Sequence, residues 1–365
     1  MLKSVIKLLI FSQLLIIQHF AKAQLFKQNN YNIEANFHYG TFLKPQPSMG
    51  YLIKGHIPAF DLKFSKSTTG DKLWEQLYRY PETGFGLYFA DFRNPQIIGN
   101  GFSVYQYIDI PIITSNIFCF SYNLSYGLAY ISKKFDADNN FYNIAIGSNL
   151  NCYGGIALNC EITLTSKLNL ISTLGYTHFS NGSISQPNLG LNVISCRLGL
   201  KYKFYNSFEK KNQIIPVFKR SNELIINYSC GYKSILPPES RKYFISSLSL
   251  NLQRLLNYKR SVGVGFDIFY DNSLSEKYKS KSIEYTNIYL FRSGLYLSHE
   301  LFLGNTSIVT QFGGYIYQKY YENGDFYSRI GVRYKITKNI STNIFLKTHF
   351  ASADCIEWGI GYHFN

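Results

Sequence analysis

Apolar and polar side chains alternate along most of the chain beyond its first 23 residues. In 326–336 (FYSRIGVRYKI), one set of alternate positions is mostly apolar, and the other set holds Arg329, Arg333 and Lys335. The last segment, 355–364, repeats the pattern with isoleucine and aromatic residues on one face. Alternation with a period of two is typical of a β-strand whose two faces meet different surroundings. The pattern therefore predicts an all-β chain.

Sixteen segments carry this pattern, and short turns separate several of them. Twelve and fourteen remain alternative counts, because the pattern fixes strand boundaries only to within a few residues. The tight turns fall on one side of the predicted sheet, and the longer polar loops 133–149 and 271–285 fall on the other. The segment 67–82 is long although it lies on the short-turn side. The predicted strands are 31–43, 56–66, 83–92, 100–112, 117–132, 150–165, 168–181, 190–205, 222–234, 242–255, 259–270, 286–301, 305–319, 325–336, 339–350 and 355–364.

Residues 1–23 have the features of a secretory signal peptide. Lys3 and Lys7 precede an apolar run over 8–17, and Ala21-Lys22-Ala23 supplies small residues at a cleavage site. We expect the mature chain to start near Gln24. Removing three lysines from a net charge of +15 leaves about +12, which suits the phosphates of anionic lipid or lipopolysaccharide. Export argues against nucleic acid as a partner.

Composition separates the remaining classes. Aromatic residues make up 17% of the chain and charged residues 16%, and no run of 18 or more apolar residues follows the signal segment. Transmembrane helices are therefore excluded, and an exported all-β chain of this kind is typical of the bacterial outer membrane. Alternation alone also fits a soluble sandwich. We predict one antiparallel up-and-down transmembrane β-barrel, with 24–205 and 222–365 joined by a linker at 206–221. Two small barrels joined at that linker are the alternative.

One predicted hairpin places chemically able side chains on a lipid-facing strand. On 168–181 the even positions are the more apolar set, and they include His178 and Ser180. A hairpin that closes symmetrically about Ser185 sets position 178 opposite Asn192, where cross-strand Cβ atoms lie about 5 Å apart. Serine, histidine and an amide then have the order of nucleophile, base and orienting group. The alternative is that these side chains belong to the polar girdle at the membrane interface.

The residues HFSNG at 178–182 and PNLGLN at 187–192 resemble the PagL family of outer-membrane lipid A 3-O-deacylases. The resemblance implies a carboxylic ester hydrolase with His178 as general base and Ser180 as nucleophile. It also implies that Asn181, Gly182 and Asn188 surround the oxyanion. The family's triad acid, a glutamate, falls on Asn192 here, and an amide can orient the imidazole without stabilising its charge. The family acts on lipid A in the outer leaflet, without a cofactor.

Other candidate chemistry is sparse. The six cysteines are scattered singly, and no spacing typical of a zinc site occurs. Near the C-terminus, Lys347, His349, Asp354 and Glu357 are expected to form a polar ladder inside the barrel, and a second site or a metal site is the alternative. Two functions stay open for the chain. One is the lipid A deacylase, and the other is a non-enzymatic barrel, porin-like or lipopolysaccharide-binding, that keeps a degenerate motif.

Overall fold

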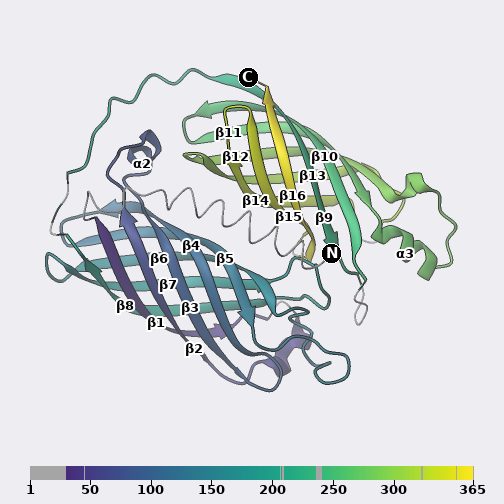
Figure 1. Ribbon diagram of the computed structural model, residues 1–365, viewed down its shortest axis with the longest axis horizontal. Helices are drawn as coiled ribbons and strands as arrows, with labels where there is room; N and C mark the ends of the chain where they lie inside the picture. Colours follow the sequence, from purple (N-terminus) through teal and green to yellow (C-terminus); the bar gives the residue numbers. More distant parts are fainter. Residues whose placement is uncertain are drawn as a thin grey trace.

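The computed structural model describes residues 30–44, 46–205, 207, 209–235, 241–321, 324–350 and 352–364. Within these residues, sixteen antiparallel strands form two closed barrels of eight strands each, which lie side by side (Figure 1). The predicted signal segment, 1–23, lies outside the described residues. The all-β, up-and-down architecture and the count of sixteen strands are confirmed.

The first barrel contains β1 (Tyr31–Phe42), β2 (Ile57–Ser67), β3 (Glu82–Asn94), β4 (Gly99–Thr114), β5 (Phe118–Ile131), β6 (Leu150–Thr163), β7 (Leu168–Ser180) and β8 (Leu191–Lys203). The second contains β9 (Ser221–Lys233), β10 (Tyr243–Asn257), β11 (Arg260–Asp271), β12 (Phe291–Leu303), β13 (Thr306–Tyr317), β14 (Phe326–Lys335), β15 (Ile340–His349) and β16 (Ser352–Phe364). The described helical segments are η1 (Pro47–Leu52), α2 (Leu73–Leu77), α3 (Ser273–Ser280) and η2 (Asn287–Leu290).

The prediction of a single barrel is wrong. Strand β8 pairs back onto β1, with Leu198 opposite Phe37, and β16 pairs back onto β9, with Ile360 opposite Tyr228. Each set of eight strands thereby closes on itself, so neither barrel has an unpaired strand edge that could pair with the other. Alternation along a strand gives its faces but does not tell which partner closes the barrel.

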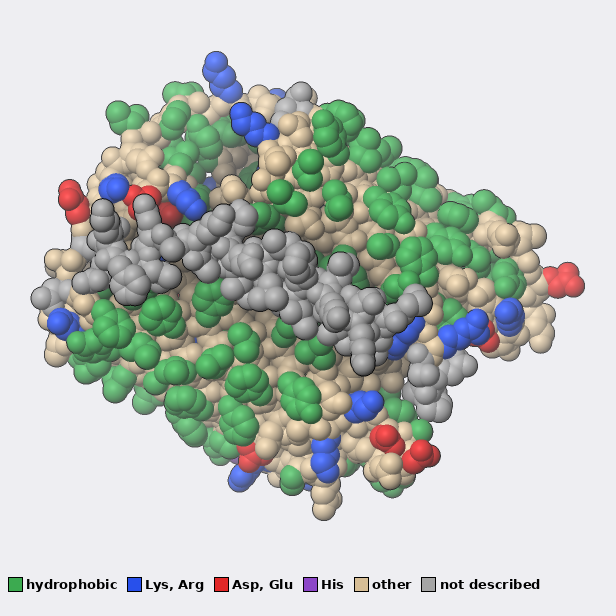
Figure 2. Space-filling model, in the orientation of Figure 1, with side chains coloured by type: hydrophobic (Ala, Val, Ile, Leu, Met, Phe, Trp, Pro, Cys, Tyr) green, Lys and Arg blue, Asp and Glu red, His purple; other side chains and the backbone are tan. Residues whose placement is uncertain are grey.

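Exposure along the strands is inverted relative to a soluble protein. On β1, Phe37 is 56% exposed, whereas Asn36 and His38 on either side of it are 1% and 3% exposed. Apolar side chains accordingly cover the visible walls of both barrels, and charged ones gather near the margins (Figure 2). An outward apolar face with an inward polar one is the pattern of a membrane barrel, and it excludes the soluble sandwich.

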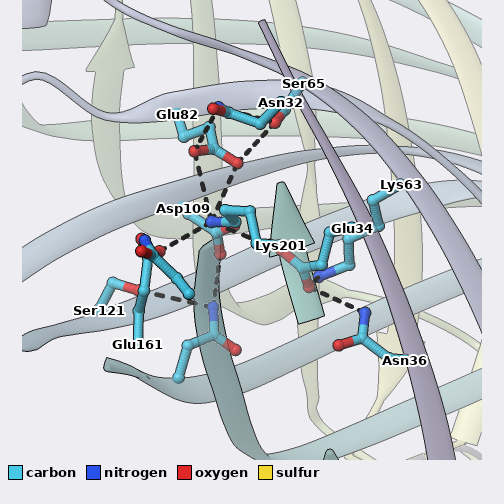
Figure 3. Close-up of polar contacts among 12 residues, drawn as sticks. Asn32, Glu34, Asn36, Lys63, Ser65, Glu82, Asp109, Ser121, Glu161 and Lys201 are labelled. Atoms are coloured by element: carbon cyan, nitrogen blue, oxygen red, sulfur yellow. Dashed lines mark hydrogen bonds and ion pairs between the residues drawn. The ribbon is translucent and has the colours of Figure 1, made fainter. Parts of the chain in front are cut away.

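Ion-pair networks fill both lumens. In the first barrel the Lys201 ammonium lies 2.8 Å from Glu161, 3.3 Å from Glu82 and 3.5 Å from Glu34 (Figure 3). In the second, Arg329 lies 2.7 Å from Asp267, and Arg333 lies 2.6 Å from Glu300. These side chains are almost fully buried, apart from partial exposure of Glu82 and Glu161. The interior is therefore a packed polar core.

Two contact zones join the barrels, one at each end, and the first lies at the end of the tight turns. The tight turns predicted at 165–167, 257–259, 304–305 and 337–339 all lie at one end, with the long segment that contains α2. There Tyr78 stacks against the Lys259 ammonium at 5.0 Å, and the Trp74 ring borders Gly304. The unexpectedly long connection on the short-turn side thus braces the second barrel. No helix among the described residues is long and apolar enough to cross a membrane.

Candidate active site at the outer rim

The hairpin of β7 and β8 brings a histidine and an asparagine together on the outer wall. His178 pairs with Asn192 in the strand register, as predicted, and His178 Nδ1 lies 2.5 Å from Asn192 Oδ1. The flanking Thr177 and Phe179 point inward, at 8% and 0% exposure, so His178 has the outward parity of Leu174, which is 51% exposed. The pair therefore lies on the lipid-facing side of the barrel.

The hydrogen bond to Asn192 determines the state of the imidazole. A carbonyl oxygen can only accept, so Nδ1 carries the proton and donates it to Asn192 Oδ1. The other ring nitrogen, Nε2, is then an acceptor, as a general base requires. The asparagine supplies the orienting half of a triad acid and lacks the negative charge.

Two further residues shape this pair, and the sequence analysis gave them no role. The Tyr176 hydroxyl donates to Asn192 Oδ1 at 2.8 Å and so keeps the carbonyl side of the amide toward the imidazole. Gly190 has a φ of 77°, and a Cβ built on it would lie 2.8 Å from His178 Cε1. Tyr176 shares the even parity of His178, which was the available signal in the sequence. The close approach of Gly190 had no such signal.

Ser180 is the last residue of β7. It pairs with Cys152 of β6, keeps the parity of His178 and is 6% exposed. Among the described residues, no hydrogen bond joins Ser180 to the imidazole. Because catalytic contacts often tighten only when substrate binds, a serine two residues from the base on the same strand face keeps the predicted order.

The residues predicted around the oxyanion lie in the loop that follows Ser180. The Asn181 N–H donates to Asn188 Oδ1 at 3.0 Å, and the Asn181 side chain donates to Ser148 Oγ at 3.0 Å. The Asn188 Nδ2 group is buried and has no hydrogen-bond partner among the described residues. A buried amide donor without an acceptor is costly, so a ligand oxygen there would satisfy it. Asn188 is thus the best placed donor of the predicted set.

Gly182 lies on the other side of the loop, against the second barrel. It has a φ of 58°, and any Cβ on it would overlap the Ile356 side chain of β16. Next to it, the Ser183 hydroxyl donates to the Ala353 carbonyl at 2.7 Å, and the Ser234 N–H donates to the Ser183 carbonyl at 2.8 Å. The loop of residues 181–190, here called the rim loop, is therefore docked on the rim of the second barrel.

A lysine of the second barrel also holds the rim loop. The Lys242 ammonium donates to the Ile184 carbonyl and to Ser185 Oγ, the latter at 3.0 Å. Burial, together with the nearby Lys134, lowers the pKa of Lys242 below the usual lysine value. Positive charge is thus concentrated where the loop meets the second barrel.

The C-terminal polar residues lie in the second lumen, as predicted. Lys347 is 3.3 Å from Asp354, and His349 Nε2 is 2.8 Å from the Tyr315 hydroxyl. Glu357 lies deeper, 3.5 Å from Arg329. Among the described residues, no group of three or more His, Cys, Asp or Glu side chains could hold a metal ion, and the six cysteines are unpaired.

Several solved structures share features with the chain. Neisserial surface protein A is 10% identical, with 48% of this chain and 97% of that chain covered at a TM-score of 0.32. The outer membrane enzyme PagL is 16% identical, with coverages of 46% and 97% and a TM-score of 0.28. A mutant porin of Rh. blastica is 12% identical, with coverages of 92% and 99% and a TM-score of 0.21. All three TM-scores are low, and the strand registers define the fold. No curated protein matches the chain.

Two closed barrels with apolar walls, polar lumens and a docked outer loop define an outer-membrane β-barrel protein. Family models then identify its relatives. Residues 59–201 match the model of lipid A 3-O-deacylase (PagL), and residues 222–365 match the model of the acyloxyacyl hydrolase C-terminal domain. The chain belongs to this family of outer-membrane hydrolases, one model falling on each barrel.

Proposed function

We propose that the protein is a serine esterase that removes an ester-linked acyl chain from lipid A in the outer leaflet. The observation that carries the proposal is the 2.5 Å contact between His178 and Asn192 on the lipid-facing wall, two residues from Ser180. Membership in a lipid A deacylase family supplies the substrate class. The rim loop lies at the end opposite the tight turns, which is the end where long outer loops are found in such barrels.

The proposed reaction follows from the proton position on the imidazole. His178 Nε2 accepts the proton of Ser180 Oγ as that oxygen attacks the ester carbonyl. The Asn188 amide donates to the oxyanion. As the bond between the acyl carbon and the sugar oxygen breaks, the protonated imidazole gives its proton to that oxygen, and the sugar leaves with a free hydroxyl. Water, activated by the same imidazole, hydrolyses the acyl-serine and releases a fatty acid.

The missing charge at Asn192 sets the expected rate. Replacing the acid of a Ser-His-Asp enzyme by asparagine costs about 10⁴ in turnover, largely because the imidazole then adopts the wrong tautomer. Here the Tyr176 hydroxyl directs Oδ1 toward the imidazole, which favours the productive tautomer. We therefore expect a turnover higher than that of such an asparagine variant and lower than that of a triad with a carboxylate.

The alternative function is a non-enzymatic barrel. A porin-like channel is disfavoured by the buried ion pairs that fill both lumens, whereas a lipopolysaccharide-binding scaffold would need the same outer surface. Planar-bilayer conductance separates the channel from the esterase, and we expect no steady conductance.

The decisive experiment is mass spectrometry of lipid A from cells that express the protein, with Ser180→Ala as the test variant. We expect the wild-type chain to remove one acyl chain and Ser180→Ala to remove none. Ser172→Ala is the matched control, because Ser172 is an outward-facing serine on the same strand. Both variants must show the heat-modifiable gel mobility of a folded barrel. Acyl loss that persists in Ser180→Ala contradicts a serine mechanism.

A further inference from the structure

A polar cavity of about 360 Å³ opens at the outer rim, where the two barrels meet. Ser183 and Gln186 of the rim loop form one side of it. The other sides come from the outer ends of β9, β15 and β16 and from α3, and include Lys233, Ser234, Lys277, His349, Ser352 and Asp354. The volume falls within the range of small-molecule sites, roughly 300–1,000 Å³. Because most of the lining is polar, the cavity suits a hydrophilic group and not an acyl chain.

Buried positive charge exceeds buried negative charge beneath this cavity. Lys233 lies 2.7 Å from both Asp271 and Asp354, and Lys347 lies 3.3 Å from Asp354. Arg292 is a third cation in the same group, since it interacts electrostatically with both carboxylates. The described members of the group thus include three cations and two anions.

Arg292 is the cation of this group that has no close carboxylate partner among the described residues. It is 1% exposed, and none of its three guanidinium nitrogens has a hydrogen-bond partner among the described residues. The guanidinium stacks on the Tyr315 ring at 5.5 Å, and the Tyr315 hydroxyl bonds to His349, which lines the cavity. No close carboxylate offsets the charge of this buried guanidinium, which is costly. Arg292 does not line the cavity and is linked to it through Tyr315 and His349, so its charge favours an anionic ligand there without a direct contact.

The cavity is also next to the proposed ester site. Ser183 lines it and lies only three positions after Ser180. A lipid whose ester reaches Ser180 from the outer leaflet would carry its sugar head group toward the same rim.

We propose that this cavity binds a phosphate monoester on the sugar head group of the lipid substrate. The second barrel then acts as a recognition module, and the first barrel carries the ester chemistry. The assignment of the ligand to the substrate rests on the proposed function, whereas binding of the phosphorylated sugar can be measured without turnover.

Binding is tested by calorimetry on the full-length Ser180→Ala protein in detergent micelles. The probes are glucosamine 1-phosphate, glucosamine and inorganic phosphate. We expect the phosphorylated sugar to bind and glucosamine not to, with inorganic phosphate weaker than the phosphorylated sugar. Arg292→Met should weaken binding severalfold, because it removes a buried cation near the cavity without removing a direct contact. Lys335→Met is the matched control, because Lys335 lies at the opposite rim, far from the cavity. Its partner Glu223 keeps a second contact, with His363, when the lysine is removed.

A loop variant covers the case in which Arg292→Met does not fold. Lys277→Gln on α3 changes a lining cation outside the barrel wall, and it should weaken binding of the phosphorylated sugar severalfold. Unchanged binding in both Arg292→Met and Lys277→Gln overturns the site. Equal affinity for inorganic phosphate and the phosphorylated sugar overturns the head-group assignment.

Turnover separates the two proposals. With lipid A as substrate, we expect removal of its phosphates to lower kcat/KM of the wild type about tenfold or more, and to lower that of Arg292→Met by a smaller factor. If the wild type cleaves phosphorylated and dephosphorylated lipid equally, the cavity inference fails and the esterase stands. If Ser180→Ala binds the phosphorylated sugar while the wild type cleaves no lipid, the proposed function fails and the binding site stands.

Discussion

Replacing Asn192 by aspartate should raise the activity of the proposed esterase. The side chains have the same shape, and Asn192 Oδ1 already lies 2.5 Å from His178 Nδ1, so Asn192→Asp adds a charge with little change in geometry. Two unit charges about 4 Å apart interact by about 4 kcal/mol at an effective dielectric constant near 20. Discounted for partial exposure at the lipid–water boundary, this corresponds to a gain of about 10²–10³ in kcat/KM, because the imidazolium forms only as the reaction proceeds.

The same geometry predicts that Tyr176 matters only while residue 192 is an amide. In the wild type, the Tyr176 hydroxyl keeps Oδ1 toward the imidazole, and one such hydrogen bond contributes about 1 kcal/mol. Tyr176→Phe should therefore lower kcat/KM about fivefold. In the Asn192→Asp background, an oxygen faces the imidazole in both orientations of the carboxylate, so Tyr176→Phe should not lower kcat/KM there.

The assay is release of fatty acid from lipid A micelles by the four members of this double-mutant cycle. Tyr228→Phe is the matched control, because Tyr228 is an outward-facing tyrosine of the second barrel, 53% exposed and paired with Ile360. Equal losses from Tyr176→Phe in both backgrounds would show that the hydroxyl acts through stability and not through amide orientation. Failure of Asn192→Asp to raise kcat/KM would remove Asn192 from the mechanism.

Three further substitutions have clear expected outcomes. Gly190→Ala should lower turnover about 10²-fold in the fatty-acid assay, because its Cβ would lie 2.8 Å from the His178 ring, and a displacement of about 1 Å can cost that much. Asn188→Asp keeps an acceptor oxygen for the loop but loses the Nδ2 donor, so it should lower kcat about 10²–10³-fold with KM little changed. Lys201→Met leaves three lumenal carboxylates without their shared cation, so it should lower the free energy of unfolding of the first barrel in urea by about 3–5 kcal/mol. Lys203→Met is the control and should cost under about 1 kcal/mol, because Lys203 has a single carboxylate partner.

The strands and the His178–Asn192 pairing could be predicted because both depend on local spacing. A period of two gives the faces of each strand, and the near-symmetrical loop after Ser180 sets residue 178 opposite residue 192. Barrel closure could not be predicted this way. The pairing of β8 with β1 joins residues more than 150 positions apart, and the alternating pattern is the same whether β8 pairs with β1 or with β9.

Within the site, the limit of prediction lies at contacts between elements distant in sequence. The inward parity of Arg292 on β12 could be read from alternation, but its lack of partners depends on which strands surround it. Gly182 is a similar case. Its place in the motif associated it with the oxyanion, while its close approach to Ile356 depends on the second barrel being there.

The contacts between the barrels connect the second barrel to the proposed ester site of the first. At the inner end, α2 and Tyr78 rest on the turns of the second barrel, and at the outer end Ser183 is bonded to both β16 and the end of β9. Two zones of contact at opposite ends resist rotation of one barrel against the other, which a single zone would allow. The rim loop is therefore held by the second barrel as well as by its own strands. Loosening the outer zone should disturb the Asn188 donor before it disturbs the His178–Asn192 pair, because Asn188 lies in the loop, whereas the pair is fixed by the register of β7 and β8.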